Sequence, residues 1–232
     1  MYELHIANKN YSSWSLRPWV LLSELGIPFH ERLVQFAPDT GSSWSAFRAF
    51  SPNGKVPCLR DGDTVVWDSL AIAEYLAERH PDVWPADPQA RAWARCAVAE
   101  MHSGFGALRT HCAMNCGLRM QLPADLPKAL RADIARINEL WNEGLARFGG
   151  PFLAGSVFGA VDAFFAPVAF RIQTYSLVMD DAAATYAQRL RELPSMQRWY
   201  ADALRETWRD PEHEDEVMQS ATLLQDLRAP AG

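Results

Sequence analysis

Cysteine is scarce in this sequence, which has Cys58, Cys96, Cys112 and Cys116 among its 232 residues. Four scattered cysteines are too few for the disulfide framework of a secreted scaffold in a chain of this length. His111, Cys112 and Cys116 fall at helical spacing and could form part of a metal site, but no fourth ligand follows at a suitable spacing. We therefore expect these side chains to pack in the core, and we predict no metal.

Basic residues are also in deficit, with 22 Lys and Arg against 28 Asp and Glu and a formal charge of −6. Binding to nucleic acid or to an anionic membrane needs a basic face, so neither partner is expected. The most apolar long stretch, residues 153–170, is interrupted by Asp162 and is short for a bilayer span. It predicts a buried helix. The first residues lack the charged and apolar pattern of a secretory leader, so the cytoplasm is the expected compartment.

Hydrophobic periodicity changes character along the chain. Alternating or short apolar runs predict strands at residues 2–7, 29–34, 57–61 and 64–67, and helical spacing predicts helices at 15–25 and 69–79. Gly26 is expected to stop the first helix, with Pro18 in its first turn. The Gly62-Asp63 pair predicts a hairpin, and residues 37–53 are expected to form a loop with one helical turn. The order is β-α-β, a loop, and then β-β-α.

The prolines between residues 80 and 88 prevent a helix from crossing this segment. We predict one domain at residues 1–82, a linker at 83–88, and an all-helical domain at 89–232. Its helices are expected at 89–122 (with a break near 104–106), 125–148, 160–178, 182–193 and 195–208. The acidic segment beyond residue 211 is expected to be a solvated helix or a loosely attached end.

Polar residues gather at three junctions of the first domain. The run Ser12-Ser13-Trp14-Ser15-Leu16-Arg17 opens the first helix, where free N–H groups favour an anion. A hydroxyl there can donate to a thiolate. Lowering a thiol pKa by two units takes roughly 2.7 kcal/mol, and a charge-assisted hydrogen bond contributes roughly 1.5–3 kcal/mol. A serine that merely caps the helix is the competing interpretation of the same residues.

The other two junctions are Lys55-Val56-Pro57, which enters a strand, and Asp68-Ser69, which opens the second helix. A proline at a strand start leaves the backbone groups of Val56 free to pair with a peptide-like ligand. Asp68 or Ser69 can meet the charged end of such a ligand. An ordinary edge-strand proline and an ordinary helix cap explain the same residues without a ligand.

The order and spacing of these three junctions resemble the glutathione-binding domain of cytosolic glutathione transferases. The run from Ser12 to Arg17 is similar to the serine motif of the zeta class, which includes maleylacetoacetate isomerase. The resemblance is specific over about residues 1–85. Further along, it rests on Phe152–Gly155 and Gly159–Asp162, which resemble the family's capping box, although Gly159 stands where serine or threonine is usual.

The resemblance implies a thioredoxin-like α/β domain followed by an all-α bundle, which is the glutathione transferase fold. It implies a homodimer and a role in detoxification. It also implies that glutathione is the cosubstrate and that its thiolate accepts a hydrogen bond from Ser13, with Ser12 as the competitor. Val56 would pair with the cysteinyl backbone beside a cis Pro57. The remaining implied glutathione contacts are Lys55 at the glycyl carboxylate, Asp68 and Ser69 at the γ-glutamyl end, and Arg17.

Three functions follow from the resemblance. The first is conjugation of the glutathione thiolate to a small apolar electrophile. The second is glutathione-dependent cis–trans isomerisation, which the zeta resemblance suggests. Trp14 replaces the zeta cysteine, however, and position 174, where the zeta substrate arginine is expected, holds threonine, with Arg171 one turn earlier. The third is a non-catalytic binding module. Thiol exchange is disfavoured, since serine stands at the active position and no C-x-x-C pair lies in this turn.

Overall fold

A computed structural model describes residues 1–36 and 43–232 of the chain. The first part of the chain contains the strands β1 (Tyr2–Ile6), β2 (Phe29–Leu33), β3 (Cys58–Asp61) and β4 (Thr64–Trp67), and the helices α1 (Ser13–Glu24), α2 (Trp44–Arg48) and α3 (Ser69–Ala77). The predicted order of elements is confirmed. The loop expected at residues 37–53 contains α2, and its positions 37–42 lie outside the described residues.

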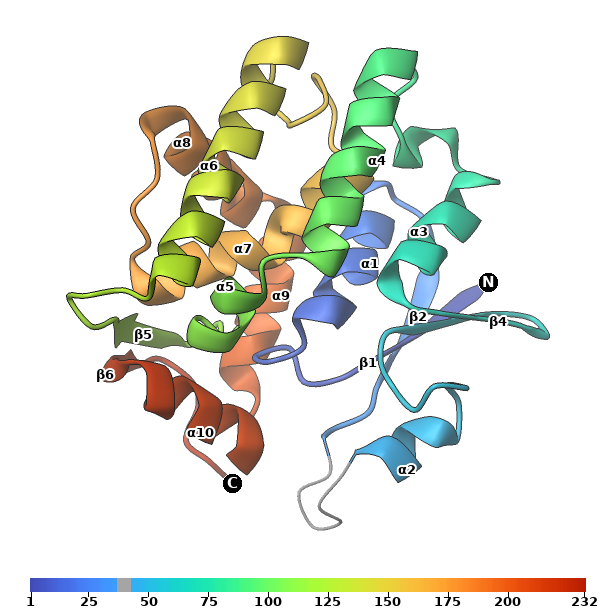
Figure 1. Ribbon diagram of the computed structural model, residues 1–232. Coiled ribbons are helices and arrows are strands. Elements are labelled where there is room, and N and C mark those ends of the chain that lie inside the picture. The colour runs from blue at the N-terminus through green and yellow to red at the C-terminus, as the bar shows by residue number, and fades with distance from the viewer. Residues whose placement is uncertain (37–42) are drawn as a thin grey trace.

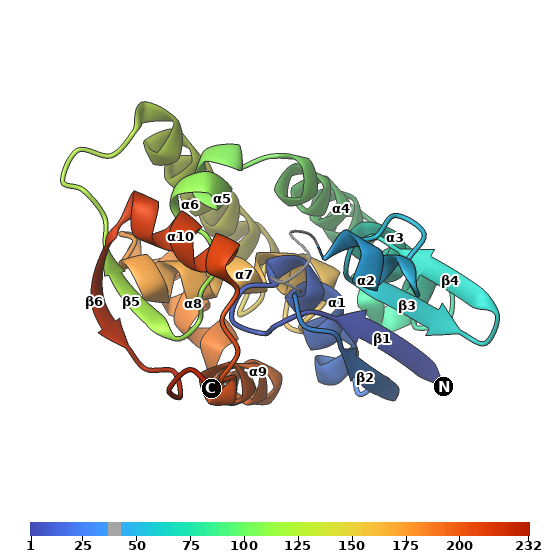
Figure 2. The same ribbon diagram turned by 90° about the horizontal axis from the view of Figure 1, so that it is seen from below.

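The strands form one mixed sheet in the order β2-β1-β3-β4 (Figure 2). Strand β1 runs parallel to β2 and antiparallel to β3, and β3 and β4 form the predicted hairpin. Its turn depends on Gly62, whose φ of +60° suits a residue without a side chain. Helices α1 and α3 contact each other and the sheet. This is the thioredoxin-like arrangement that the sequence predicts.

The second part of the chain is largely helical. It contains η2 (Pro81–Val83), α4 (Pro88–Ser103), α5 (Gly106–His111), β5 (Leu118–Gln121), α6 (Lys128–Phe148), α7 (Ala160–Tyr175), α8 (Asp181–Glu192), α9 (Pro194–Arg205), α10 (Pro211–Ser220) and β6 (Thr222–Asp226). Within the described residues, no helix has the length and apolar character needed to span a membrane.

Helix α7 lies at the centre of the molecule, against α1, α4, α8 and β5 (Figure 1). Nearly all of its residues are buried, as expected for a helix without a solvent face. One hydrophobic core runs from the sheet, with Leu4 and Ile6, through α1 to Phe164 and Phe165 of α7. The start of α1 is therefore fixed between the two parts of the chain.

A buried carboxylate at the start of α7 joins several segments. Asp162 accepts hydrogen bonds from the N–H groups of Leu153 (3.0 Å) and Gly159 (3.0 Å) and from the Tyr186 hydroxyl (2.8 Å). Gly159 has no side chain to complete a reciprocal cap, so only the Asp162 half of the capping box is present. A Cβ atom at position 159 would come within 3.2 Å of the Val83 carbonyl oxygen, a tight contact that favours glycine here.

Two expectations about local structure are wrong. The second part of the chain is not entirely helical, because residues 118–121 and 222–226 pair as the antiparallel strands β5 and β6. The acidic segment beyond residue 211 forms a helix, α10, which is the first of the two expected alternatives. The second wrong expectation is where the first helix starts. Helix α1 begins at Ser13 rather than at residue 15, which places Pro18 in its second turn and leaves the Trp14 carbonyl without an N–H donor four residues on.

Candidate active site

The two candidate serines at the start of α1 have different partners. The Ser12 hydroxyl donates to Ser15 Oγ at 2.7 Å, so it is used within the helix start. Its side chain forms no capping hydrogen bond. Ser13 Oγ accepts a long hydrogen bond of 3.5 Å from Nη2 of Arg171. Because the guanidinium is the donor, the Ser13 proton is available for a further acceptor such as a thiolate.

Three arginine side chains lie near Ser13 at the start of α1. Arg17 is fully buried, with its Cζ 4.1 Å from the centre of the Trp14 ring, and its Nη1 donates to Ser69 Oγ at 3.4 Å. The guanidinium of Arg109 also lies over the Trp14 ring, at 4.8 Å. Arg171 comes from the C-terminal part of α7, and its Nε donates to the Cys112 carbonyl at 2.7 Å.

In the described part of the chain, Arg17, Arg109 and Arg171 form no ion pair, and each has a buried guanidinium nitrogen without a hydrogen-bond partner. Burial, followed by the charge of Arg109, lowers the pKa of Arg171 to about 10. This value still leaves Arg171 cationic at neutral pH. Burial likewise lowers the pKa of Arg109. Uncompensated buried cations favour a nearby anion, so the surroundings of Ser13 suit negative charge.

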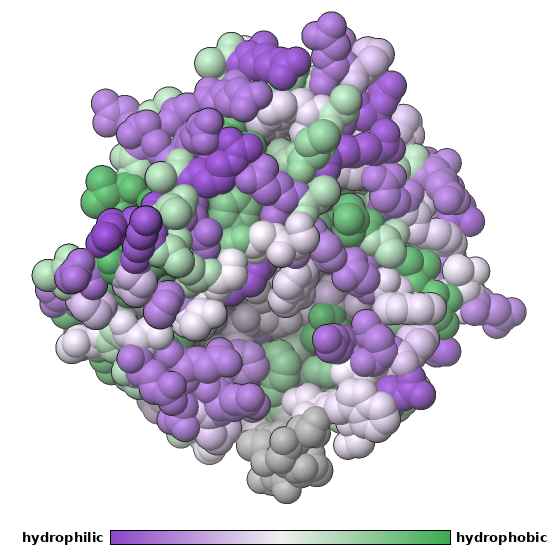
Figure 3. All heavy atoms as spheres, in the orientation of Figure 1, coloured by the Kyte–Doolittle hydropathy of each residue, from purple (hydrophilic) through white to green (hydrophobic). Residues whose placement is uncertain are grey.

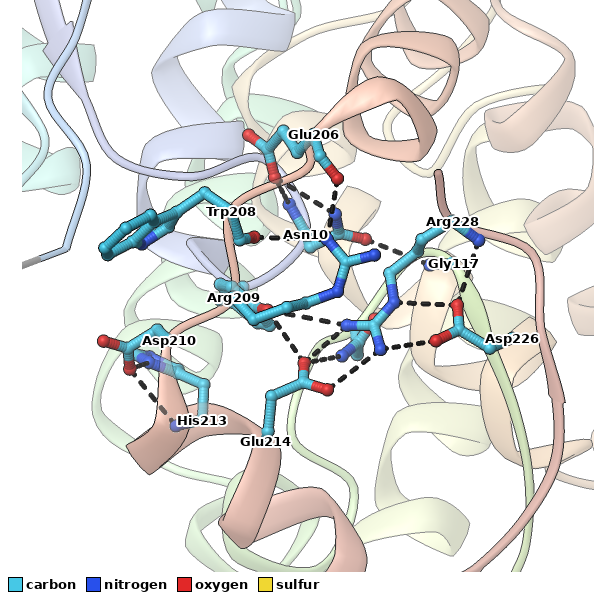
Figure 4. Close-up of polar contacts among 12 residues, drawn as sticks. Asn10, Gly117, Glu206, Trp208, Arg209, Asp210, His213, Glu214, Asp226 and Arg228 are labelled. Carbon is cyan, nitrogen blue, oxygen red and sulfur yellow. Dashed lines mark hydrogen bonds and ion pairs between the residues drawn. The ribbon is translucent and has the colours of Figure 1, made fainter. Parts of the chain in front are cut away.

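The loop before α1 is held in place by the second part of the chain, as Figure 4 shows for Asn10 and Glu206. The Glu206 carboxylate accepts from the backbone N–H groups of Lys9 (2.6 Å) and Asn10 (3.1 Å). The Asn10 side chain accepts from the Gly117 N–H at 3.2 Å. These contacts fix the backbone that leads to Ser12 and Ser13.

Tyr11, in the same loop, is tied to α10. Its hydroxyl donates to Glu214 at 2.8 Å, and Glu214 also pairs with Arg228, which in turn contacts Asp226 of β6 at 2.8 Å (Figure 4). The Arg228 side chain is only 3% exposed. Burial raises the pKa of Glu214, but the hydrogen bonds from Arg228 and Tyr11 outweigh it, and the pKa falls below its ordinary value. The acidic helix α10 and the strand β6 that follows it therefore support the loop that carries the serines.

Replacing Arg228 by methionine is expected to lower the free energy of unfolding by about 3 kcal/mol, because Glu214 and Asp226 then lose their cation. Chemical denaturation by urea measures this loss. Arg205→Met is the matched control, since Arg205 pairs with Asp202 at 2.9 Å but its side chain is 74% exposed. An exposed pair contributes about 0.2–1 kcal/mol. Equal losses in the two variants would show that the Arg228 network does not hold the segment.

Ser13 and Arg171 lie in a cleft of about 1050 Å³ between the two parts of the chain. Lys55 and Val56 line it from the first part, and Arg109 and Met114 line it from the second. Helix α10 adds a wall that carries Asp210, Glu212, His213 and Glu216. Figure 3 shows the surface hollowed between this polar wall and the region of α2. The cleft has an apolar and cationic floor with an acidic side wall.

Comparisons with known proteins agree with this geometry. Residues 11–79 match the family model "Glutathione S-transferase, N-terminal domain". The chain is 24% identical over 214 residues to the glutathione S-transferase-like protein OpS6 of Beauveria bassiana, covering 84% of this chain and 93% of that protein. The theta class glutathione S-transferase of Xanthomonas axonopodis pv. citri, solved with glutathione bound, superposes with a TM-score of 0.60 at 25% identity, covering 86% of this chain and 96% of that one. Residues 11–79 are thus those of a glutathione S-transferase N-terminal domain, and the chain has the glutathione S-transferase fold.

The fold and the identification of the chain as a glutathione S-transferase enzyme are therefore confirmed. Similarity to the theta class is more local. Mouse glutathione S-transferase theta-3 is 32% identical over 129 residues, and that match covers 52% of each chain. Glutathione is present in solved relatives of this transferase, including one from Burkholderia at 22% identity with a TM-score of 0.63.

The structure brings some of the predicted site residues of the transferase together. Ser12, Ser13, Lys55 and Val56 share the cleft, and the bond between Val56 and Pro57 is cis, as the resemblance implies. Arg17 does not line the cleft, and it connects Trp14 with Ser69 instead.

Asp68 lies elsewhere. It caps α3 by accepting from the Leu70 N–H at 2.8 Å, and its φ of +77° is unusual for a residue with a side chain. Its carboxylate also approaches His102 Nε2 at 3.4 Å. It borders a separate depression of about 630 Å³ that also contains Trp67 and Glu74. The capping interpretation of Asp68 is thus confirmed, and a glutathione contact at Asp68 stays a prediction.

The family resemblance alone does not indicate that Arg171 belongs to the site, because the expected substrate position is residue 174, one turn later. Arg171 reaches Ser13, whereas the Thr174 hydroxyl donates to the Asn115 carbonyl at 2.8 Å. The sequence does contain a signal for this residue, since Arg171 and Asp162 are the two charged residues of the largely apolar α7. Such a residue is buried only with a partner or a function.

Of the three residues at metal-like spacing, Cys112 and Cys116 pack in the core as expected, whereas His111 is only half-buried. Cys112 and Cys116 are fully buried in the hydrophobic core, and burial raises the pKa of Cys112 to about 12, so this thiol is protonated at neutral pH. Across residues 1–36 and 43–232, no three His, Cys, Asp or Glu side chains converge in a way that would hold a metal ion.

Proposed function

We propose that this transferase binds glutathione in the cleft and holds its cysteinyl sulfur as a thiolate against the Ser13 hydroxyl. One observation carries the choice of Ser13 over Ser12. The Ser12 hydroxyl is bound to Ser15, whereas Ser13 accepts from Arg171 and keeps its own proton for the sulfur. The cations of Arg171 and Arg109 add a favourable potential for the same negative charge.

In this proposal the rest of glutathione lies along the first domain. The backbone of Val56 pairs with the cysteinyl residue beside the cis bond to Pro57, and Lys55 neutralises the glycyl carboxylate. Ser69 and Asp68 receive the γ-glutamyl end. Arg17 is a positioning residue, since it orients Ser69 through a 3.4 Å hydrogen bond.

The proposed reaction is a nucleophilic substitution on a small electrophile. The glutathione thiol gives its proton to solvent, and the thiolate attacks an electrophilic carbon. A carbon–sulfur bond forms as a leaving group such as chloride departs with its electron pair. The protein contributes stabilisation of the thiolate and proximity of the two reactants, and an apolar surface that includes Trp14 and Met114 receives the electrophile.

The proposal also includes properties that the family resemblance suggests. We propose that the chain divides into a glutathione-binding domain at residues 1–82, a linker at 83–88 and a helical domain at 89–232. We also propose that the protein is a zeta-like, cytoplasmic homodimer with a role in detoxification. Glutathione-dependent isomerisation is the second candidate, which the position of Arg171 in the cleft favours. Assaying a maleyl compound beside an aryl halide separates the two activities.

Binding and ionisation of glutathione test the proposal together. Titration calorimetry is expected to show one glutathione bound per chain, and ultraviolet difference spectra are expected to show the thiolate at neutral pH. Turnover of chlorodinitrobenzene then measures conjugation. A chain that binds glutathione without ionising it would be a binding module of the same fold, and a chain that does not bind it would lack the proposed function altogether.

A further inference from the structure

The positive charge in the cleft exceeds what bound glutathione neutralises. Arg17 feels the opposite charge of Asp68 and Arg109 feels that of Asp133, but no carboxylate in the described part of the chain comes close enough to form an ion pair with Arg109 or Arg171. The thiolate proposed at Ser13 supplies one negative charge next to Arg171. The guanidinium groups of Arg109 and Arg171, neither of which forms an ion pair, therefore share a single anion, the proposed thiolate. Their positive charge could also stabilise a second anion.

Arg109 and Arg171 are held so that each keeps a donor. Nε of Arg109 donates to the Gly104 carbonyl at 3.2 Å and its Nη2 donates to the Met101 carbonyl, which leaves Nη1 buried and without a partner. In Arg171, Nε and Nη2 are bonded to Cys112 and Ser13, and Nη1 is again buried without a partner. Arg171 is 3% exposed, and both arginines line the cleft.

A buried donor without a partner costs free energy, and a buried cation without a partner costs more. Backbone carbonyls fix both guanidinium groups, so the free donors do not depend on flexible side chains. The ring of Trp14 lies beside Arg109 and provides a flat apolar surface next to them. A ligand that suits all these features has a flat apolar body and an anionic group at one edge.

We propose that Arg109 and Arg171 form a subsite for the carboxylate of an electrophile whose flat body lies against Trp14. This inference rests on the proposed function and names the class of its second substrate, a carboxylate-bearing conjugated or aromatic electrophile. The carboxylate accepts from the free Nη1 groups, and the reactive carbon lies near the sulfur at Ser13. The acidic wall of α10, with Glu212 and Glu216, disfavours a carboxylate on the opposite side and so sets its orientation.

Chlorodinitrobenzoate and its methyl ester test the subsite, because they differ in charge and react by the same substitution. Each kcat/KM is divided by the uncatalysed rate with glutathione, which removes the difference in intrinsic reactivity. The wild type is expected to favour the carboxylate by about 10- to 100-fold, the effect of a charge-assisted contact. Arg109→Met is expected to bring this ratio close to one, and Arg109→Lys is expected to keep part of it.

The matched control is Arg147→Met, since Arg147 lies on α6 with a side chain that is 49% exposed, and it should keep the wild-type ratio. Binding of dinitrobenzoate and of its methyl ester, measured by calorimetry without glutathione, is a second readout that needs no turnover. The expected result is binding of the acid alone, weakened by Arg109→Met.

The outcomes separate the two proposals. Conjugation of the ester as efficiently as the acid, or a ratio that Arg109→Met leaves unchanged, overturns the carboxylate subsite and leaves the transferase proposal standing. Selective binding of dinitrobenzoate that Arg109→Met abolishes, together with no conjugation of either compound, supports the subsite and overturns the transferase proposal.

Discussion

Replacing Ser13 by alanine is expected to raise the pKa of enzyme-bound glutathione by about one to two units, because the thiolate loses one charge-assisted hydrogen bond. At neutral pH the turnover of chlorodinitrobenzene should fall by about 10- to 100-fold. The remaining activity should rise with pH until the thiol is ionised. Ultraviolet titration of the bound thiol and the pH profile of kcat/KM measure the two effects independently.

Two controls accompany this variant. Ser23→Ala changes a serine on the same helix, away from the cleft, and should leave the thiol pKa unchanged. Ser12→Ala removes the hydrogen bond to Ser15 and should lower stability by about 0.5–1.5 kcal/mol while the thiol pKa stays low. A raised thiol pKa in Ser12→Ala together with an unchanged one in Ser13→Ala would assign the thiolate contact to Ser12.

Replacing Asp162 by alanine is expected to destabilise the fold by about 3–5 kcal/mol. The substitution leaves the Leu153 N–H, the Gly159 N–H and the Tyr186 hydroxyl without their acceptor, and each such buried donor costs about 1–3 kcal/mol, with incomplete additivity. Chemical denaturation measures the loss. Asp181→Ala, in the exposed first turn of α8, is the control and should cost less than about 1 kcal/mol.

The same carboxylate should make stability depend on pH. Burial is the main influence and raises the pKa of Asp162 from 3.8 to about 6, despite the hydrogen bonds that oppose it. Between these two values the unfolded chain has lost the proton that the folded chain retains, so the free energy of unfolding falls as pH rises through this window. Asp162→Asn has no proton to lose and should lack this part of the pH dependence. A wild-type curve parallel to that of the variant would contradict the raised pKa.

The first domain could be predicted well because its signals are local. The hairpin at Gly62, the helix that starts at Ser69 and the cis Pro57 all follow from residues close together in sequence or from the family resemblance. The strands β5 and β6 could not be found in this way. Each is a short run whose partner lies about one hundred residues away, and a two-stranded pairing depends on that partner rather than on its own propensity.

In the candidate site, too, the residues with a local sequence signal could be predicted, and those brought together by packing could not. Ser12 and Ser13 were found because a serine run at a helix start has a recognisable meaning, but the sequence left the choice between them open. The positions of Arg171 and Arg109 relative to Ser13 depend on how α7 and α5 pack against α1, over sequence separations of about one hundred residues or more. Only the packed structure shows that these guanidinium groups converge.

Different elements of the fold provide the different surfaces of the cleft. The proposed thiolate contact comes from α1 and the proposed carboxylate contacts come from α5 and α7. The opposite wall of the cleft comes from α10, which is followed by β6, the strand that pairs with β5. Exchanging the cleft-lining residues Glu212 and Glu216 of α10, with Glu214 kept in place to hold Tyr11, should therefore reset which electrophiles are accepted while glutathione activation is retained. The range of accepted electrophiles can therefore change without a change in how the glutathione thiolate is stabilised.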